Sequence, residues 1–436
     1  MIAQQNTAYA FLSIKVKYLW CSLHLALAIL LPIFISGCAT TFEPKPFDET
    51  RFLTHAVTKS DGDSTVTVDV LTPDESIEVF GADLTGKGIQ PVWIEIENSG
   101  LYPYWFVPHR LDPEYYPAME IANIIHGSAS GNAKKKIYDH FYDIRMTRYI
   151  PPGETRRGFV FTKFEQGLKH LAIKIIGKDS VKQFYFALEI PGPEMDFQTV
   201  DFDYLFENQV ILDLDLPGLR RELEKLPCCT TDAKGMSFGD PLNLVIVGDR
   251  MLVMSELLSC GWNLTETIRA GSVYKMILSS VFGKRYLTAP VSPLYFQSRQ
   301  QDFAMQKTRS DINRRNHLRL WLSPMTVEGR PVWIGQISRD IGIKFTTKSP
   351  YLVTHEISPN VDEARHYIIE ELIASHSVEM VGYARGSEPA SHRAPRQNLT
   401  GDDYFTDGLR AVIFLQDRYI PFNEITWLEW ENPENW

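Results

Sequence analysis

The sequence of 436 residues lacks the short motifs that most often reveal an enzyme or a metal protein. No HExxH or CxxC occurs, so it carries no strong metal-binding signature. A hydrolase nucleophile motif, GxSxG, is also missing. The segment VGDR at 247–250 follows an apolar run but contains a single glycine, which argues against a dinucleotide site. These absences leave the cofactor unknown and the question of enzyme activity open.

The sequence also contains fewer basic than acidic residues, 44 against 54, and few long apolar runs. The net charge is −10, and it becomes −12 without residues 1–37, which contain two lysines and no acidic residue. A surplus of acid argues against a nucleic-acid partner. The apolar run at 18–35 is the single stretch long enough to approach a membrane span.

That apolar run ends in Ile35-Ser36-Gly37-Cys38, after Lys15 and Lys17 near its start. A positive segment, an apolar segment and small residues before a cleavage point are typical of a secretory signal peptide. The four residues resemble the lipobox of bacterial lipoproteins, an aliphatic residue and two small residues before cysteine. The resemblance implies cleavage after residue 37 and acylation of Cys38, for example by palmitate, so that the chain is anchored to a membrane by its lipid.

An uncleaved transmembrane helix is the alternative for this run, although Pro32 and the Ser-Gly pair weaken a helix there. The residue after the cysteine is Ala39 rather than aspartate. In Gram-negative lipoproteins aspartate at this position retains the protein in the inner membrane, so the resemblance implies a cell-envelope location in the outer membrane, facing the periplasm.

The remainder predicts two domains joined by a connector. Residues 38–55 read as a tether with two prolines. Residues 56–192 contain short alternating strands such as STVTVDVLT and PVWIEIENSG, which predict an all-β, immunoglobulin-like sandwich with a helical insertion at 111–148. Residues 193–240 predict a connector with one short helix. Residues 241–432 alternate strand and helix patterns, which predicts a layered α/β (α+β) domain.

The candidate catalytic residues lie in this second domain. Strand alternation in RRNHLRLWL puts His317, Arg319 and Trp321 on one face. Asp340 is placed at the end of a later strand, and His355 follows it. Two histidines could act in acid–base chemistry or bind a metal, with Asp340 orienting them and Arg319 holding an anion. A purely structural role for each of them is the alternative, because nothing in the sequence determines how the segments meet.

A second candidate site pairs Asp362 with Arg365. These residues are three apart near an expected helix start, so they share a face and predict at least a helix ion pair.

The motifs of this half resemble the LssY C-terminal domain family. They are LPCCTTD, GDPLNLVIVG, SPLYFQSRQQDFAMQKTRSDINRRNHLRLWL, RPVWIGQISRDIGIKF and HEISPNVDEARHYIIEEL, over roughly 215–430. The activity of that family is not established. Its relatives are often attached to a membrane phosphatidic acid phosphatase module, whose Ser-Gly-His motif is missing here. The resemblance therefore implies a bacterial envelope setting, and the phosphatase activity cannot be carried over to this chain.

Two further groups of residues have alternative roles. Cys228 and Cys229 could form a disulfide between neighbours, but two buried thiols are favoured, with Cys260 left over. Four aromatic residues could form a contact patch, although filling of the sandwich core is favoured for them: Trp93, Tyr102, Tyr104 and Trp105.

The features together predict an envelope lipoprotein that binds or assembles with an envelope protein or lipid. The alternative is an envelope hydrolase that uses the His, Asp and Arg side chains of the second domain.

Overall fold

The structure is a computed structural model that describes residues 55–433, with gaps at 109–110, 112–114, 128, 130, 270, 273–285, 309–314 and 346–352. The expected signal peptide, the lipidation site Cys38 and nearly all of the tether at 38–55 lie outside the described residues. In the part that is described, no helix is both long enough and apolar enough to cross a membrane.

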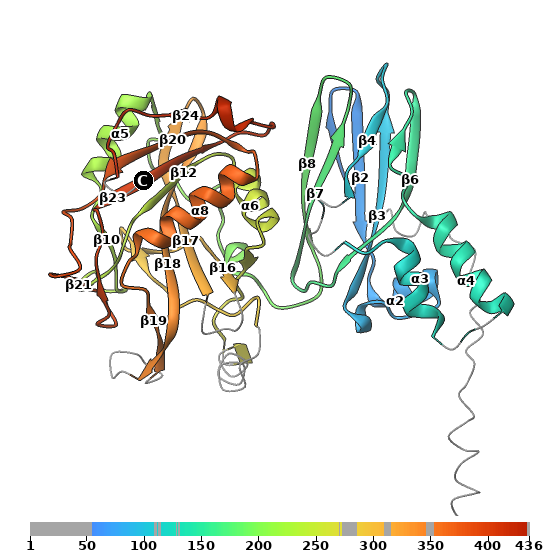
Figure 1. Ribbon diagram of the computed structural model, residues 1–436, viewed down its shortest axis with the longest axis horizontal. Coiled ribbons are helices and arrows are strands. Elements are labelled where there is room, and N and C mark those ends of the chain that lie inside the picture. Colours follow the sequence, from blue (N-terminus) through green and yellow to red (C-terminus); the bar gives the residue numbers. More distant parts are fainter. Residues whose placement is uncertain are drawn as a thin grey trace, which may run out of the picture.

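The N-terminal part contains two antiparallel sheets of four strands each (Figure 1). The first has the order β1-β2-β3-β6, and its strands are β1 (Val57–Asp61), β2 (Ser64–Val70), β3 (Ile89–Asn98) and β6 (Glu154–Lys163). The second has the order β5-β4-β7-β8, and its strands are β5 (Tyr149–Ile150), β4 (Tyr104–Phe106), β7 (Leu168–Ile176) and β8 (Val181–Glu189).

Alternation in β2 and β3 explains how these sheets pack. Val66 of β2 pairs with Ile96 of β3, and both side chains enter a hydrophobic cluster shared with residues of β7 and β8 such as Leu171 and Phe184. Successive strand residues point to opposite faces, so β3 presents Trp93 to the other side, and the neighbouring strand β6 presents Phe161 there. Both faces of the first sheet are therefore buried in this region.

Three helices cover the outer face of that sheet. They are α2 (Pro73–Phe80), α3 (Ala118–His126) and α4 (Gly131–Ile144), and the 3₁₀ turn η2 (Thr85–Lys87) follows the first of them. The insertion expected at 111–148 supplies α3 and α4. Helix α2 was not predicted from the sequence. Thr72 caps its N-terminus in a capping box, in which Thr72 and Glu75 each accept a hydrogen bond from the backbone N–H of the other, and Gly81 ends it in the left-handed conformation.

The C-terminal part is built on a sheet of ten strands. Its main path runs β13-β16-β17-β18-β12-β23-β20-β24, while β19 pairs with β18 and β9 pairs with β17. The strands are β9 (Leu212–Leu214), β12 (Leu244–Val247), β13 (Asn263–Leu264), β16 (Phe303–Thr308), β17 (Arg315–Val327), β18 (Arg330–Phe345), β19 (Val353–Ile357), β20 (Val378–Arg385), β23 (Leu409–Leu415) and β24 (Thr426–Trp427).

Helices cover both faces of this sheet (Figure 1). Helices α6 (Arg250–Ser259) and α8 (Asp362–Ala374) pack on the face that carries Leu318 and Leu320. Helix α5 (Leu216–Lys225) packs on the face that carries Trp321. The chain is thus mostly β with six α-helices among the described residues, which confirms a mixed α/β fold.

The segment expected as a connector at 193–240 contributes structure to the C-terminal part. Strand β9 extends the sheet, Leu219 and Leu223 of α5 are fully buried, and η4 (Asp196–Thr199) precedes them. Smaller sheets lie around it: β10 (Cys229–Thr231), β11 (Phe238–Pro241), β14 (Tyr295–Phe296) and β15 (Arg299–Gln300) form one, and β21 (Arg396–Gln397) and β22 (Asp403–Tyr404) form another. The last short turn is η5 (Phe422–Glu424).

Two expectations about this part are wrong. The structure joins Cys228 and Cys229 in a disulfide instead of leaving two thiols; the shared peptide bond holds their Cα atoms 3.7 Å apart, and Cys260 takes no part in this disulfide. Strand β18 does not end near Asp340 but continues to Phe345, because β19 pairs with its second half. A register shift between Asp340 and Gly342 marks where this pairing begins.

The two parts meet where α6 approaches β7 and β8 (Figure 1). Tyr185 of β8 packs in the same hydrophobic cluster as α6, and its hydroxyl donates to Oδ1 of Asp417 at 3.1 Å. His170 of β7 lies 2.7 Å from the hydroxyl of Ser255 on α6. Buried polar contacts of this kind hold β7 and β8 against α6 in the described structure.

Candidate functional site

Three neighbouring strands bring five ionisable side chains together on one face of the C-terminal sheet. Period-two alternation along β17 places Arg315, His317 and Arg319 on this face. Asp340 comes from β18 and His355 from β19, which pair with one another and with β17 through β18. We call these five residues the polar centre.

The carboxylate of Asp340 is the meeting point of the polar centre. Its Oδ2 atom lies 3.2 Å from Nε2 of His317, 3.6 Å from Nδ1 of His355 and 3.6 Å from Nε of Arg315. The two imidazole rings lie edge to face, with centroids 6.3 Å apart. The sequence predicts four candidate catalytic residues, and the structure brings three of them together: His317, Asp340 and His355.

The fourth candidate catalytic residue, Arg319, forms hydrogen bonds with residues outside this group. Its Nη1 donates to Oε1 of Gln336 at 2.6 Å, and its Nε and Nη2 donate to the carbonyl of Ser292 at 3.2 and 3.0 Å. These hydrogen bonds use most of the N–H donors of the guanidinium group. Arg319 therefore acts on Asp340 only through its positive charge.

The polar centre is closed. The exposed fraction of the side chain is 1% for Arg315, 7% for His317, 2% for Asp340 and 20% for His355. The four facing atoms, Arg315 Nε, His317 Nε2, Asp340 Oδ2 and His355 Nδ1, have contacts that do not meet hydrogen-bond geometry. Four such atoms at one buried point are uncommon in a folded protein, which makes the centre a functional candidate.

Burial sets the protonation states. It raises the pKa of Asp340 to about 7, although the positive charges of Arg315 and Arg319 act in the opposite direction. Burial and the same two arginines hold the pKa of His317 well below its ordinary value. Burial, with Arg315 adding to it, lowers the pKa of His355 to about 3. Both imidazoles are therefore neutral at pH 7, and a carboxyl group close to half-ionised lies between them.

The group suited to proton transfer here is the carboxyl group of Asp340, because an acid with a pKa near 7 can both give and take a proton at neutral pH. The polar centre is less suited to a metal ion. In the described ranges, no group of three or more His, Cys, Asp or Glu side chains has the arrangement of a metal site. The guanidinium of Arg315 also occupies one side of the Asp340 carboxylate.

Sequence reasoning missed the amide and carboxylate residues that support the polar centre. Gln306, opposite His317 on β16, accepts a hydrogen bond from Arg315. Asp240 accepts from Asn398 Nδ2 at 2.9 Å and from Gln336 Nε2 at 3.3 Å. The alternation of β16 could have identified Gln306, but Asn398 is distant in sequence and carries no local signal.

The second predicted pair, Asp362 and Arg365, forms a separate cluster. Arg365 is fully buried and donates to both carboxylate oxygens of Asp407, at 2.8 and 2.6 Å, and to the carbonyl of Leu409 at 2.6 Å. Asp362 accepts from Thr406 Oγ1 at 2.8 Å and lies 3.4 Å from Arg365. The cluster ties the start of α8 to the segment before β23, which is a structural role.

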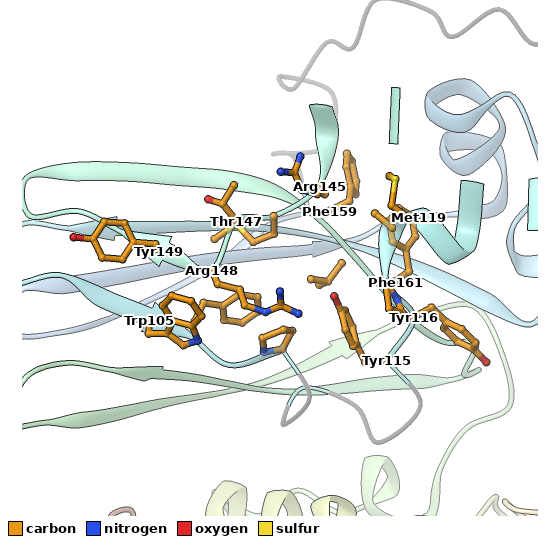
Figure 2. A pocket seen from close by; sticks show the side chains of 16 residues that line it. Trp105, Tyr115, Tyr116, Met119, Arg145, Thr147, Arg148, Tyr149, Phe159 and Phe161 are labelled. Carbon is orange, nitrogen blue, oxygen red and sulfur yellow. The ribbon is translucent and has the colours of Figure 1, made fainter. Parts of the chain in front are cut away.

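The predicted aromatic patch divides into core and surface. Trp93 and Tyr104 are 2% and 6% exposed and fill the core, as favoured. Tyr102 and Trp105 are 53% and 50% exposed, so core filling is wrong for these two. Trp105 lines a cavity of about 390 Å³, which we call the aromatic pocket (Figure 2).

Comparisons with known proteins identify the C-terminal part. The match to a solved structure is weak: a crystal structure of a DUF4426 family protein from Pseudomonas aeruginosa PAO1 is 14% identical, over 33% of this chain and 100% of that chain, with a TM-score of 0.16. No curated protein matches the chain. Residues 220–409 match the family model described as the LssY C-terminus, and these residues, which include the polar centre, therefore form an LssY-like C-terminal domain.

Proposed function

We propose that this chain is a lipid-anchored protein of the bacterial envelope that binds an envelope component through its N-terminal part. The anchor would be a lipid on Cys38, within Ile35-Ser36-Gly37-Cys38, followed by the tether at 38–55. In this proposal the two N-terminal sheets form an immunoglobulin-like domain, and the LssY-like domain follows it as a second domain.

The anchor predicts that cells fed labelled palmitate incorporate the label into this chain. Cys38→Ser removes the acylated thiol, so we expect the label to disappear and the protein to leave the membrane fraction. Cys21→Ser, which changes a cysteine before the expected cleavage point, is the matched control. Equal labelling of the Cys38→Ser protein would contradict the anchor.

The proposed binding function rests on one observation: the two candidate sites differ in how accessible they are to a ligand. The polar centre is covered, whereas the aromatic pocket is open and Trp105 beside it is half exposed. A ligand can reach only an accessible surface, and pockets with aromatic walls and a few polar groups are the usual ligand sites of proteins.

Co-sedimentation tests the binding function. The full chain, purified in detergent, is mixed with isolated cell-wall sacculi or with phosphatidylglycerol vesicles, and the retained fraction is measured. We expect retention on one of the two and a loss of about tenfold in Trp105→Leu, which is the order expected when a central aromatic contact is removed. Trp427→Leu is a matched control, because Trp427 is 49% exposed and lies on β24 in the C-terminal part. Retention on neither material, or equal loss in both variants, would contradict the proposal.

A hydrolase that uses the polar centre is the second candidate. The observation in its favour is that His317, Asp340 and His355 converge although they come from three strands. In this alternative the carboxyl group of Asp340, with a pKa of about 7, gives a proton to the substrate or takes one from it. Its test is the Asp340→Asn variant described in the Discussion.

A further inference from the structure

The aromatic pocket is assembled from segments that are far apart in sequence (Figure 2). Trp105 comes from β4, Tyr115 from the segment before α3, and Phe161 from β6. Arg145, Thr147, Arg148 and Tyr149 lie between α4 and the end of β5. The walls are thus anchored on strands of both N-terminal sheets, and a pocket on such elements keeps its shape better than one made of loops alone.

The lining residues that the structure describes carry positive charge. Two arginines and no acidic residue occur among the 16 lining residues. Arg145 is already engaged, because it donates to the carbonyl of Tyr142 and its guanidinium lies 3.4 Å from the centroid of the Tyr142 ring. Among the lining residues that the structure describes, the cationic group available to a ligand is therefore Arg148.

Arg148 is exposed and has no ion pair or side-chain hydrogen bond with any residue that the structure describes. Figure 2 shows its guanidinium between the rings of Trp105 and Tyr115. Arg148 also acts electrostatically on Tyr115: burial raises the pKa of Tyr115, and the positive charge of Arg148 lowers it. A planar guanidinium with unused donors is the group that binds a carboxylate or phosphate through two parallel hydrogen bonds.

The other walls suit a ring with hydroxyl groups. Trp105 is half exposed, and Thr147 is an exposed residue with a hydroxyl group among the lining residues. A volume of about 390 Å³ lies at the small end of the range for ligand pockets, roughly 300–1,000 Å³. That size suits one or two sugar rings. A phospholipid headgroup would give Arg148 a phosphate but would leave the face of Trp105 without a ring to stack on.

We propose that the aromatic pocket binds a sugar that carries a carboxylate, with the sugar ring on Trp105 and the carboxylate on Arg148. The proposal rests on the binding function proposed above and names its ligand class. The sugar acid would be a unit of an envelope glycan, which is the polymer that a lipid-anchored envelope protein can reach.

Calorimetric titration with two sugars tests this proposal. N-acetylmuramic acid and N-acetylglucosamine differ by one lactyl group, which carries the carboxylate. For the full chain in detergent we expect the acid to bind at least tenfold more tightly than the neutral sugar, because the ion pair with Arg148 forms only with the acid. Arg148→Gln should remove that preference without changing the binding of the neutral sugar, and Trp105→Leu should weaken both.

Arg393→Gln is the matched control, because Arg393 is also exposed but lies in the C-terminal part. Equal binding of the two sugars, binding of neither, or an unchanged preference in Arg148→Gln would overturn the proposal. Trp105-dependent retention on phosphatidylglycerol vesicles, without sugar binding, would also overturn it while leaving the binding function in place. A thermal unfolding curve for each variant separates loss of binding from loss of fold.

Discussion

Replacing Arg365 by methionine is expected to lower the free energy of unfolding by about 3–5 kcal/mol, which is the usual cost of removing one partner from a buried ion pair. The side chain is fully buried, and it neutralises Asp407 and Asp362 while satisfying the carbonyl of Leu409. Methionine fills a similar volume but leaves the two carboxylates facing one another. Urea denaturation at pH 7, followed by circular dichroism, measures the loss.

Arg365→Lys refines this prediction. Lysine keeps the charge but cannot form the two parallel hydrogen bonds to Asp407, so we expect it to recover only part of the lost stability. Arg393→Met at an exposed position controls for the loss of an arginine as such. A loss below about 1 kcal/mol in Arg365→Met, the range of exposed ion pairs, would show that the cluster is not a clamp between α8 and the segment before β23.

The second large effect is expected in the pH dependence of Asp340→Asn. Burial raises the pKa of Asp340 from 3.8 to about 7 in the folded chain. The folded state therefore holds this proton more tightly than the unfolded state, and the stabilisation is complete below pH 3.8 and is lost as the pH rises to about 7. The shift of roughly 3 pKa units corresponds to about 4 kcal/mol. Relative to Asp340→Asn, the unchanged protein should lose about that much between pH 4 and pH 7.5.

The difference between the two proteins is the quantity to measure, since the other buried groups titrate in both. His317 and His355 have lowered pKa values, so their contribution runs the other way and is lost as the pH falls below 6.5. If Arg315 and Arg319 outweigh burial, the carboxylate stays ionised and the difference changes sign. Urea titrations at five pH values decide between these outcomes.

The same variant tests the hydrolase alternative. Asparagine is nearly isosteric with aspartate but cannot exchange a proton near pH 7, so a hydrolase at the polar centre would lose its activity while the protein stays folded. A screen with chromogenic esters and phosphoesters supplies the substrate for the comparison. Activity that survives in Asp340→Asn would exclude this centre as the catalytic site.

Local sequence pattern predicted several elements because their causes are local. The alternation of Val66, Val68 and Val70 predicts β2, and all three side chains are buried. Alternation likewise predicts that His317 and Arg319 share a face of β17. The family motifs predict an LssY-like domain, which the match over 220–409 confirms. The pattern of side chains along one strand depends on the backbone of that strand alone.

Tertiary structure alone decided how these strands meet. Asp340 meets both His317 and His355 because β18 continues past Asp340 and pairs with β19, a register that depends on residues far apart in sequence. Burial of the whole centre, half-exposure of Trp105 and the position of Arg148 between two aromatic rings have the same origin. The order of residues along each strand determined which side chains share a face. The contacts between strands determined which faces are covered and which remain open to a ligand.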